Sequence, residues 1–168
     1  NIRTFLDAPC GDWLWMQSMN LTGLQYFGGD ITNVTVQTNQ RCFGTDNIHF
    51  HWFDLTCMIP PAVDLILVRD VLFHLPEDRV HTILNNINQS GAKYFATTTF
   101  SSGSNGNFKD GAAYPETIAK RVGKELRSPI GFQRLNLYAE PFNLPPPLLK
   151  AKEDFPGRQV GIWKLPMN

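Results

Sequence analysis

The sequence lacks a long hydrophobic run, an excess of charge of either sign and a closely spaced pair of cysteines. No apolar stretch approaches the ~20 residues that a membrane-spanning helix needs, and no basic-then-apolar leader opens the chain. Its 15 basic and 15 acidic residues give a formal net charge of zero, which leaves no basic field to hold a nucleic-acid backbone. The basic cluster at 120–127 fits the solvated face of a helix. We therefore expect a soluble protein for which membranes and nucleic acids are poor partners.

Cysteine usage is equally sparse. Cys10, Cys42 and Cys57 form no metal-ligand spacing, and an odd number cannot all pair within one chain. This favours a reducing compartment, and the cytoplasm is the predicted location. His49 and His51 alternate along one predicted strand as a metal pair would, but no third ligand is evident nearby, so no metal site is predicted.

The 168 residues, of which 42% are hydrophobic, are enough for one packed domain over 1–168. Because the chain opens almost directly on a strand, we expect an N-terminal segment to be missing or disordered. Short apolar runs alternate with longer amphipathic ones, which predicts an α/β protein with a parallel sheet. Predicted strands are 2–6, 25–29, 48–53, 63–68, 93–100 and 159–165, and predicted helical crossovers are 13–24, 31–41 and a helix from 76–78 to 90–91.

Three further features refine this pattern. The near-continuous apolar run 63–68 is typical of a central strand covered on both faces. Residues 135–138 and the last strand are joined without a clear helix, which predicts an antiparallel hairpin at the sheet edge. Residues 101–111, rich in Gly, Ser and Asn, predict a mobile loop of the kind that often covers sites.

Acids follow three of the predicted strands. Asp7 ends the first within a glycine-bearing turn, Asp30 ends the second and Asp54 follows the third. The carboxyl ends of parallel strands meet at one edge of a sheet, so these acids should converge there. Asp30 lies 23 residues after Asp7, close to the ~20-residue interval at which an acid accepts ribose hydroxyls. Asp54 would accept from the amine of adenine, while Ile31 and Leu55 pack against the base.

The turn after the first strand helps to choose the cofactor. Ala8, Cys10 and Gly11 let the backbone approach a ligand closely, but Trp13 and Trp15 stand where a dinucleotide fingerprint needs small residues, which disfavours NAD. S-adenosylmethionine carries no phosphate, only a sulfonium and a zwitterionic tail, so one close approach and several carboxylates suffice. The residues therefore favour S-adenosylmethionine.

The chain resembles the class I S-adenosylmethionine-dependent methyltransferases over nearly its whole length. The resemblance rests on segments 6–12 with 15–16, 26–31, 54–55 and 64–75, continued by 93–100, 135–137 and 141–142. It implies a Rossmann-like, seven-stranded, mostly parallel sheet with an antiparallel last strand and helices on both faces. It also implies that the methionine portion meets Asp7, Cys10 and Gly11, the ribose and adenine meet Asp30, Ile31, Asp54 and Leu55, and the sulfonium side meets Arg69, Asp70 and Val71.

This resemblance implies a methyltransferase that acts by in-line displacement at the methyl carbon, a reaction helped mainly by positioning in a dry pocket. A hydroxyl acceptor would need a base. His74, on the turn beyond the fourth strand, is a candidate because imidazole titrates near neutral pH, and Asp70 is the other. The chain lacks an Asn/Asp-Pro-Pro-Tyr-type sequence after that strand, which argues against amino-group methylation of bases or glutamine. A small-molecule acceptor is the default.

Other interpretations remain open at this stage. Asp7 and Asp30 would also serve merely as caps of following helices, and His74 as a polar residue at a helix start. The chain would equally suit a non-catalytic module of the same fold that keeps the cofactor pocket. A short oxidoreductase is disfavoured by the glycine count and by the absence of a Tyr-x-x-x-Lys pair.

Overall fold

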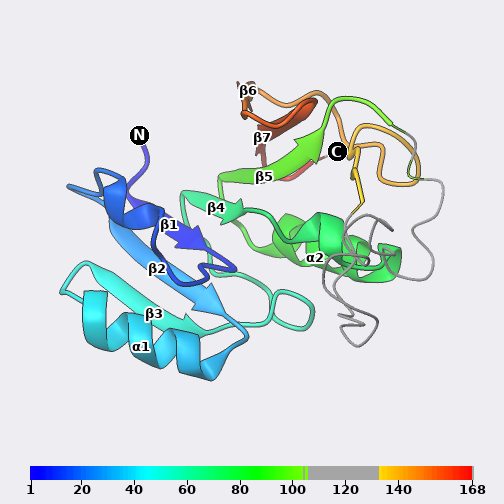
Figure 1. The fold of residues 1–168 in the computed structure, drawn as a ribbon. Coiled ribbons are helices and arrows are strands. Elements are labelled where there is room, and N and C mark those ends of the chain that lie inside the picture. Colours follow the sequence, from blue (N-terminus) through cyan, green and yellow to red (C-terminus); the bar gives the residue numbers. More distant parts are fainter. Residues whose placement is uncertain (104, 106–132, 168) are drawn as a thin grey trace.

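A seven-stranded sheet organises the protein (Figure 1), in a computed structural model that describes residues 1–103, 105 and 133–167. The strand order is β3-β2-β1-β4-β5-β7-β6. Strand β7 runs antiparallel to both of its neighbours, β5 and β6. The other neighbouring pairs are parallel. The predicted Rossmann-like sheet is confirmed. Its strands are β1 Thr4–Asp7, β2 Gln25–Asp30, β3 Ile48–Trp52, β4 Leu65–Val68, β5 Tyr94–Phe100, β6 Leu149–Lys152 and β7 Arg158–Lys164.

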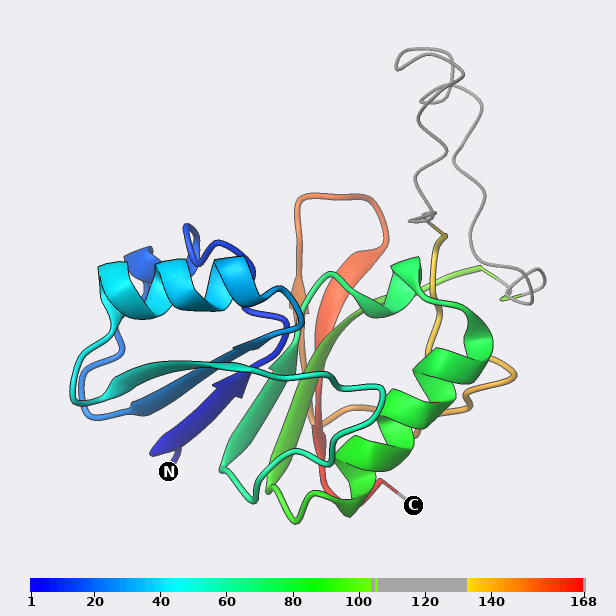
Figure 2. The same ribbon diagram turned by 90° about the horizontal axis from the view of Figure 1, so that it is seen from below.

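Two α-helices, α1 (Asn33–Phe43) and α2 (Glu77–Gln89), pack on opposite faces of this sheet (Figure 2). Alternation along the strands divides the buried side chains between the two faces. We call the two groups the α1-side cluster and the α2-side cluster. The α1-side cluster includes Phe5, Cys10, Trp13, Tyr26, Val36, Phe50 and Leu67. The α2-side cluster includes Leu6, Leu55, Ile66, Val68, Val80, Ile83, Leu84, Ile87 and Phe95.

The helix predicted over 13–24 is wrong. This segment consists of turns and one short 3-10 helix, η1 (Met16–Ser18). Trp13 has a positive φ of 63°, and its buried ring contacts Tyr26, Phe43 and Phe50. Trp13 packs its ring into the α1-side cluster with this left-handed backbone conformation. A right-handed α-helix cannot continue through such a residue, which explains why the predicted helix does not form.

The strand predicted at 135–138 is also wrong. Leu135 and Leu137 are buried, yet β4 and β7 pair with the two sides of β5, so no position beside β5 is left for them. The segment is instead held at the end of β5, where Phe100 N–H donates to the Leu135 carbonyl and Leu137 N–H donates to Thr99 Oγ1. The strand that pairs with β7 in the hairpin is β6.

Three further expectations concern composition. In the part of the chain that the structure describes, no helix combines the length and the apolarity needed to cross a membrane. All three cysteines are free thiols. The basic cluster at 120–127 and most of the loop predicted at 101–111 lie outside the described residues.

Candidate functional site

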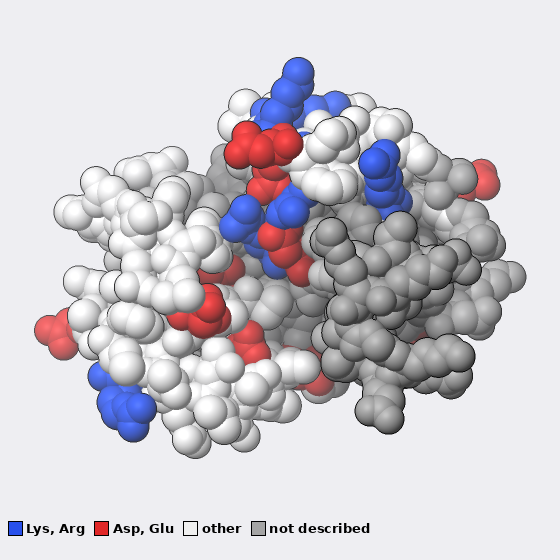
Figure 3. Space-filling view, in the orientation of Figure 1, with Lys and Arg blue, Asp and Glu red and all other residues white. Residues whose placement is uncertain are grey.

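The acids predicted to converge lie at the carboxyl ends of the parallel strands β1, β2 and β3. The strand register aligns Asp7 with Gly28, two residues before Asp30, and aligns Asp30 with Trp52, two residues before Asp54. Asp30 and Asp54 therefore each lie two residues beyond the position that pairs with the preceding acid. Figure 3 shows Asp and Glu side chains near the middle of the face in view, with Lys and Arg side chains beside them.

Asp7 is the most deeply buried of these acids, with 1% of its surface exposed. Its Oδ2 accepts a hydrogen bond from the Tyr26 hydroxyl at 2.7 Å, whereas its Oδ1 has no partner among the described residues. Burial raises the pKa of Asp7 to about 7, against the hydrogen bond from Tyr26 and the charge of Arg69, which lower it. A buried acceptor without a donor is a position where a ligand's ammonium group would be stabilised.

Asp30 fixes the loop that follows β1. Its Oδ2 accepts from Gly11 N–H at 3.2 Å and its Oδ1 from Thr32 N–H at 2.9 Å. Thr32 is the N-cap residue of α1, and no side chain of the described residues makes a capping hydrogen bond to that helix, so the helix-cap interpretation of Asp30 is wrong. Each carboxylate oxygen has a second lone pair, however, so further donors such as ribose hydroxyls remain compatible with these contacts.

The close approach of this loop to β2 depends on glycine. A Cβ on Gly29 would lie 2.8 Å from the Phe53 Cβ and 3.2 Å from the Ala8 Cβ. Cys10 N–H also donates to the Gly29 carbonyl at 2.8 Å. The β2 glycine therefore lets the neighbouring segments pack closely at this point, whereas the approach of the Ala8, Cys10 and Gly11 backbone to a ligand stays a prediction.

Asn39, on α1, is a site residue that the sequence analysis missed. It is 2% exposed, and its side-chain amide donates to the Gly11 carbonyl at 2.8 Å. A signal was present, because Asn39 lies three residues after the buried Val36 and therefore on the apolar face of its helix. Burial also raises the pKa of the Cys10 thiol to about 12, which favours its neutral form.

The predicted site residues that follow β2 and β3 differ in how exposed they are. Ile31 is 63% exposed, and Trp52, another residue the sequence analysis missed, donates its indole N–H to the Ile31 carbonyl at 2.9 Å. Asp54 accepts from the Thr56 hydroxyl and amide, which holds the pKa of Asp54 below its usual range. Leu55 is buried in the α2-side cluster, so its backbone alone is left for the predicted adenine contact.

The segment after β4 carries the remaining predicted residues. Asp70 has a φ of 59°, and its Oδ1 accepts from the Thr98 hydroxyl at 2.9 Å and from Arg158 at 2.5 Å. Arg69 lies over the Trp15 ring at 4.6 Å from its centroid. Val71 is partly buried and packs against the α2-side cluster. These contacts join the β4 end to the loop after β1.

His74 closes the short 3-10 helix η2 (Leu72–His74) that follows Val71. Its ring is half-buried, 4.4 Å from the ring of Phe73. The carboxylate of Asp70 already contacts the Arg158 guanidinium and the Thr98 hydroxyl, which leaves it less accessible to an acceptor's proton. Of the two predicted bases, His74 is therefore the better suited.

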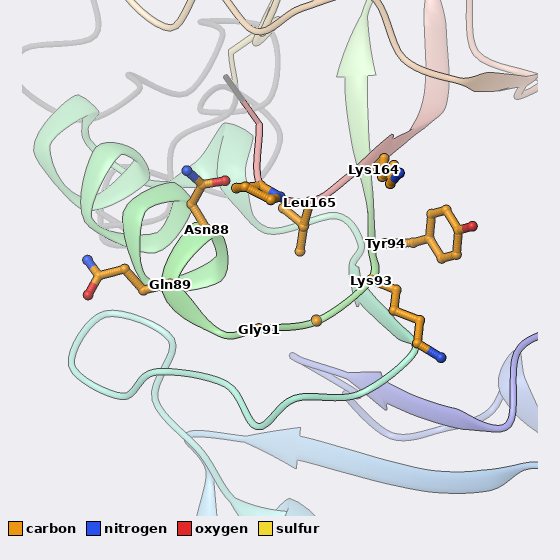
Figure 4. Close-up of a pocket in the computed structure, with 9 residues that line it drawn as sticks. Asn88, Gln89, Gly91, Lys93, Tyr94, Lys164 and Leu165 are labelled. Carbon is orange, nitrogen blue, oxygen red and sulfur yellow. The ribbon is translucent and has the colours of Figure 1, made fainter.

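Hollows in the surface lie at both the amino and the carboxyl ends of the parallel strands. One of about 490 Å³ is at the amino end of β5, between Lys93, Tyr94 and Lys164 (Figure 4), far along the strands from the acids. Two others, of about 400 and 370 Å³, lie at the tip of the β6–β7 hairpin, and Arg69 lines the first of them. Open space thus borders the end of β4 on the side where the acids lie.

Neither a family model nor a curated protein matches this sequence. Solved structures do match. Mitomycin 7-O-methyltransferase superposes with a TM-score of 0.67 at 17% identity, over 97% of this chain and 49% of that chain. Human N-acetylserotonin methyltransferase in complex with S-adenosylmethionine gives 0.62 at 15% identity, over 98% and 48%. Magnesium protoporphyrin IX methyltransferase from Synechocystis PCC 6803 with bound S-adenosylhomocysteine gives 0.60 at 14%, over 98% and 74%. The chain spans about half the length of the first two.

Proposed function

We propose that this chain, which has the class I methyltransferase fold, binds S-adenosylmethionine at the carboxyl edge of its sheet and transfers the methyl group to a small-molecule acceptor. The observation that carries the proposal is the arrangement of Asp7, Gly11 and Asp30. Gly11, in the loop after β1, donates its N–H to the carboxylate of Asp30 at the end of β2. Asp7, the last residue of β1, has a buried carboxylate oxygen without a partner among the described residues.

The residues fit the cofactor part by part. Asp7 offers an uncommitted acceptor for the ammonium of the methionine portion, next to Ala8, Cys10 and Gly11. Beside it, Asp30 keeps lone pairs for the ribose hydroxyls. The adenine is assigned to the Ile31 side chain, Asp54 and the backbone of Leu55, and the sulfonium side to Arg69, Asp70 and Val71.

Bound there, S-adenosylmethionine supplies an electrophilic methyl carbon. The chain's part is to hold the acceptor in line with that carbon and to exclude water, which accounts for most of the rate of such displacements. His74 takes the proton of a hydroxyl acceptor, and Asp70 is the alternative base. Mitomycin, N-acetylserotonin and magnesium protoporphyrin, the compounds after which the neighbours are named, are all small molecules, which supports that acceptor class.

Calorimetric titration with S-adenosylmethionine and S-adenosylhomocysteine tests the cofactor assignment. We expect binding by the unsubstituted chain, at least tenfold weaker binding by Asp30→Asn because a charge-assisted bond of roughly 1.5–3 kcal/mol is lost, and unchanged binding by Asp46→Asn, which alters an exposed acid. Thermal unfolding of each variant verifies that it is folded. Equal affinity of the Asp30→Asn and unsubstituted chains would contradict the assignment.

A non-catalytic module that keeps the cofactor pocket is the second candidate. The commitment of Asp70 to Thr98 and Arg158 favours it, since one of the two candidate bases is already paired. Transfer of radiolabelled methyl groups to a panel of small hydroxylated acceptors separates the candidates. Turnover that falls at least a hundredfold in His74→Gln, with unchanged S-adenosylhomocysteine affinity, supports the enzyme; cofactor binding without turnover on any acceptor supports the module.

A further inference from the structure

The tip of the β6–β7 hairpin reaches the segment that follows β4. Glu153 directly follows β6 and Arg158 begins β7, and the two lie 84 and 88 residues along the chain from their partners Arg69 and Asp70. The tip is itself anchored to the end of β5, because Ser101 N–H donates to the Gly157 carbonyl at 2.8 Å. The antiparallel insertion of β7 beside β5 therefore brings the hairpin to the proposed site.

Four side chains at this contact form a closed ring of alternating charge, which we call the charge ring. Arg69 Nη2 lies 2.9 Å from Glu153 Oε1, Arg158 Nη2 lies 2.5 Å from Asp70 Oδ1, and Arg158 Nε pairs with Glu153 Oε2. Arg69 Nε completes the ring at 3.9 Å from Asp70 Oδ2. The side chains of Glu153 and Arg158 are 18% and 22% exposed and those of Arg69 and Asp70 are 29% and 37% exposed, so the Glu153–Arg158 pair is the part of the ring least screened by solvent.

The charge ring holds an unfavourable backbone conformation. Asp70 is a non-glycine residue with a φ of 59°, a left-handed backbone conformation that L-residues seldom adopt. Its N–H donates to Thr98 Oγ1 at 3.2 Å, and its carboxylate is fixed by Thr98 and Arg158. Without Arg158, the Asp70 side chain would keep Thr98 and the more distant Arg69 as its partners among the described residues.

Arg69 carries the effect across to the first loop, because its guanidinium lies over the ring of Trp15. We infer that Glu153 and Arg158 are positioning residues: through the charge ring they set Arg69 and Asp70 in the orientation that the sulfonium side of the cofactor requires. The inference rests on the proposed function for its consequence in binding, but the connection from Glu153 through Arg69 to Trp15 can be measured without any ligand.

Glu153→Gln tests the inference with little change of shape. We expect the Glu153→Gln chain to bind S-adenosylmethionine about three- to tenfold more weakly, while the Glu140→Gln chain, with the same change at an exposed glutamate outside the ring, binds it as the unsubstituted chain does. In an Arg69→Gln background the effect of Glu153→Gln should shrink to the part carried through Arg158, because the contact between Glu153 and Arg69 is already lost. A purely structural role would instead lower affinity equally in both backgrounds.

Tryptophan emission supplies the readout that needs no cofactor. Glu153→Gln should change the emission spectrum by releasing Arg69 from the Trp15 ring, and the change should disappear when Trp15→Phe is added. Identical spectra for the folded Glu153→Gln and Glu140→Gln chains would overturn the inference. If the spectra differ as expected but no chain binds S-adenosylmethionine, the positioning of Arg69 stands and the proposed cofactor function fails.

Discussion

At the scale of single residues, Asp7 is held in a neutralising environment. Its pKa is raised from 3.8 to about 7 by burial, so the folded chain binds a proton over a pH range in which the unfolded chain has released it. Stability from this group is fully present below pH ~4 and is lost as the pH rises through 7. A donor arriving from a ligand would offset that loss, which ties the destabilisation at Asp7 to binding.

Asp7→Asn should therefore flatten the pH dependence of stability. Between pH 4 and 8 we expect the free energy of unfolding of the unsubstituted chain to fall by up to roughly 4 kcal/mol relative to that of Asp7→Asn, since a shift of about three pKa units corresponds to that difference. Urea unfolding at a series of pH values measures it, with Asp46→Asn as the control. Parallel profiles for Asp7→Asn and the unsubstituted chain would show that Asp7 is already ionised when folded.

Asn39 gives a second test at this scale. Replacing it by Ala leaves the Gly11 carbonyl without its side-chain donor, which should lower the free energy of unfolding by roughly 1–3 kcal/mol and weaken S-adenosylhomocysteine binding. Gln37→Ala, a substitution at an exposed position on the same helix, is the control. Thermal unfolding and calorimetry measure the two effects, and an unchanged affinity in a destabilised Asn39→Ala chain would separate Asn39 from the site.

The candidate site was predictable from sequence only where a local pattern encodes it. Acids placed directly after apolar strands indicated Asp7, Asp30 and Asp54, because strand ends are readable from composition. Asn39 and Trp52 were missed, since their roles depend on which side chain of a neighbouring element faces the loop. The spacing of Asn39 from Val36 indicates that Asn39 is buried, but a single sequence does not show which residue of the loop it contacts.

At the scale of elements, periodicity succeeded where one face of an element is buried. In α2, four apolar residues recur at helical spacing after an acidic first turn, and the helix forms where the pattern places it. The segment 13–24 has a larger share of apolar residues, seven of twelve against four of thirteen in α2, but its backbone is governed by the burial of one indole ring. The strand-like alternation of 135–138 failed for a related reason, because both edges of β5 were already occupied.

Substitutions in α2 should accordingly lower the free energy of unfolding only where they fall on its buried face. Ile83→Ala removes a side chain that is 1% exposed and should cost about 2–5 kcal/mol of unfolding free energy. Asn85→Ala, on the exposed face, should change it by less than about 0.5 kcal/mol, because alanine favours a helix and no buried contact is lost. Chemical unfolding compares the pair. Similar losses in both variants would mean that α2 does not pack as described.

At the scale of the whole molecule, the sheet order explains how distant segments meet at one edge. The strands β1, β2 and β3 deliver acids there, β4 delivers Arg69 and Asp70, and the antiparallel β7 brings Arg158 back to the same place. A parallel last strand would begin at the opposite edge, and the hairpin would then lie away from the site. The inserted antiparallel strand thus contributes to the site as well as to the sheet.

The most direct test of this account is a crystal structure of the chain with S-adenosylhomocysteine. The account predicts adenosine density at the carboxyl edge, with the ribose on Asp30, the base against Ile31 and the amino group on Asp7. Density in the hollow between Lys93 and Lys164, at the opposite edge of the sheet, or an empty carboxyl edge at saturating ligand, would contradict it.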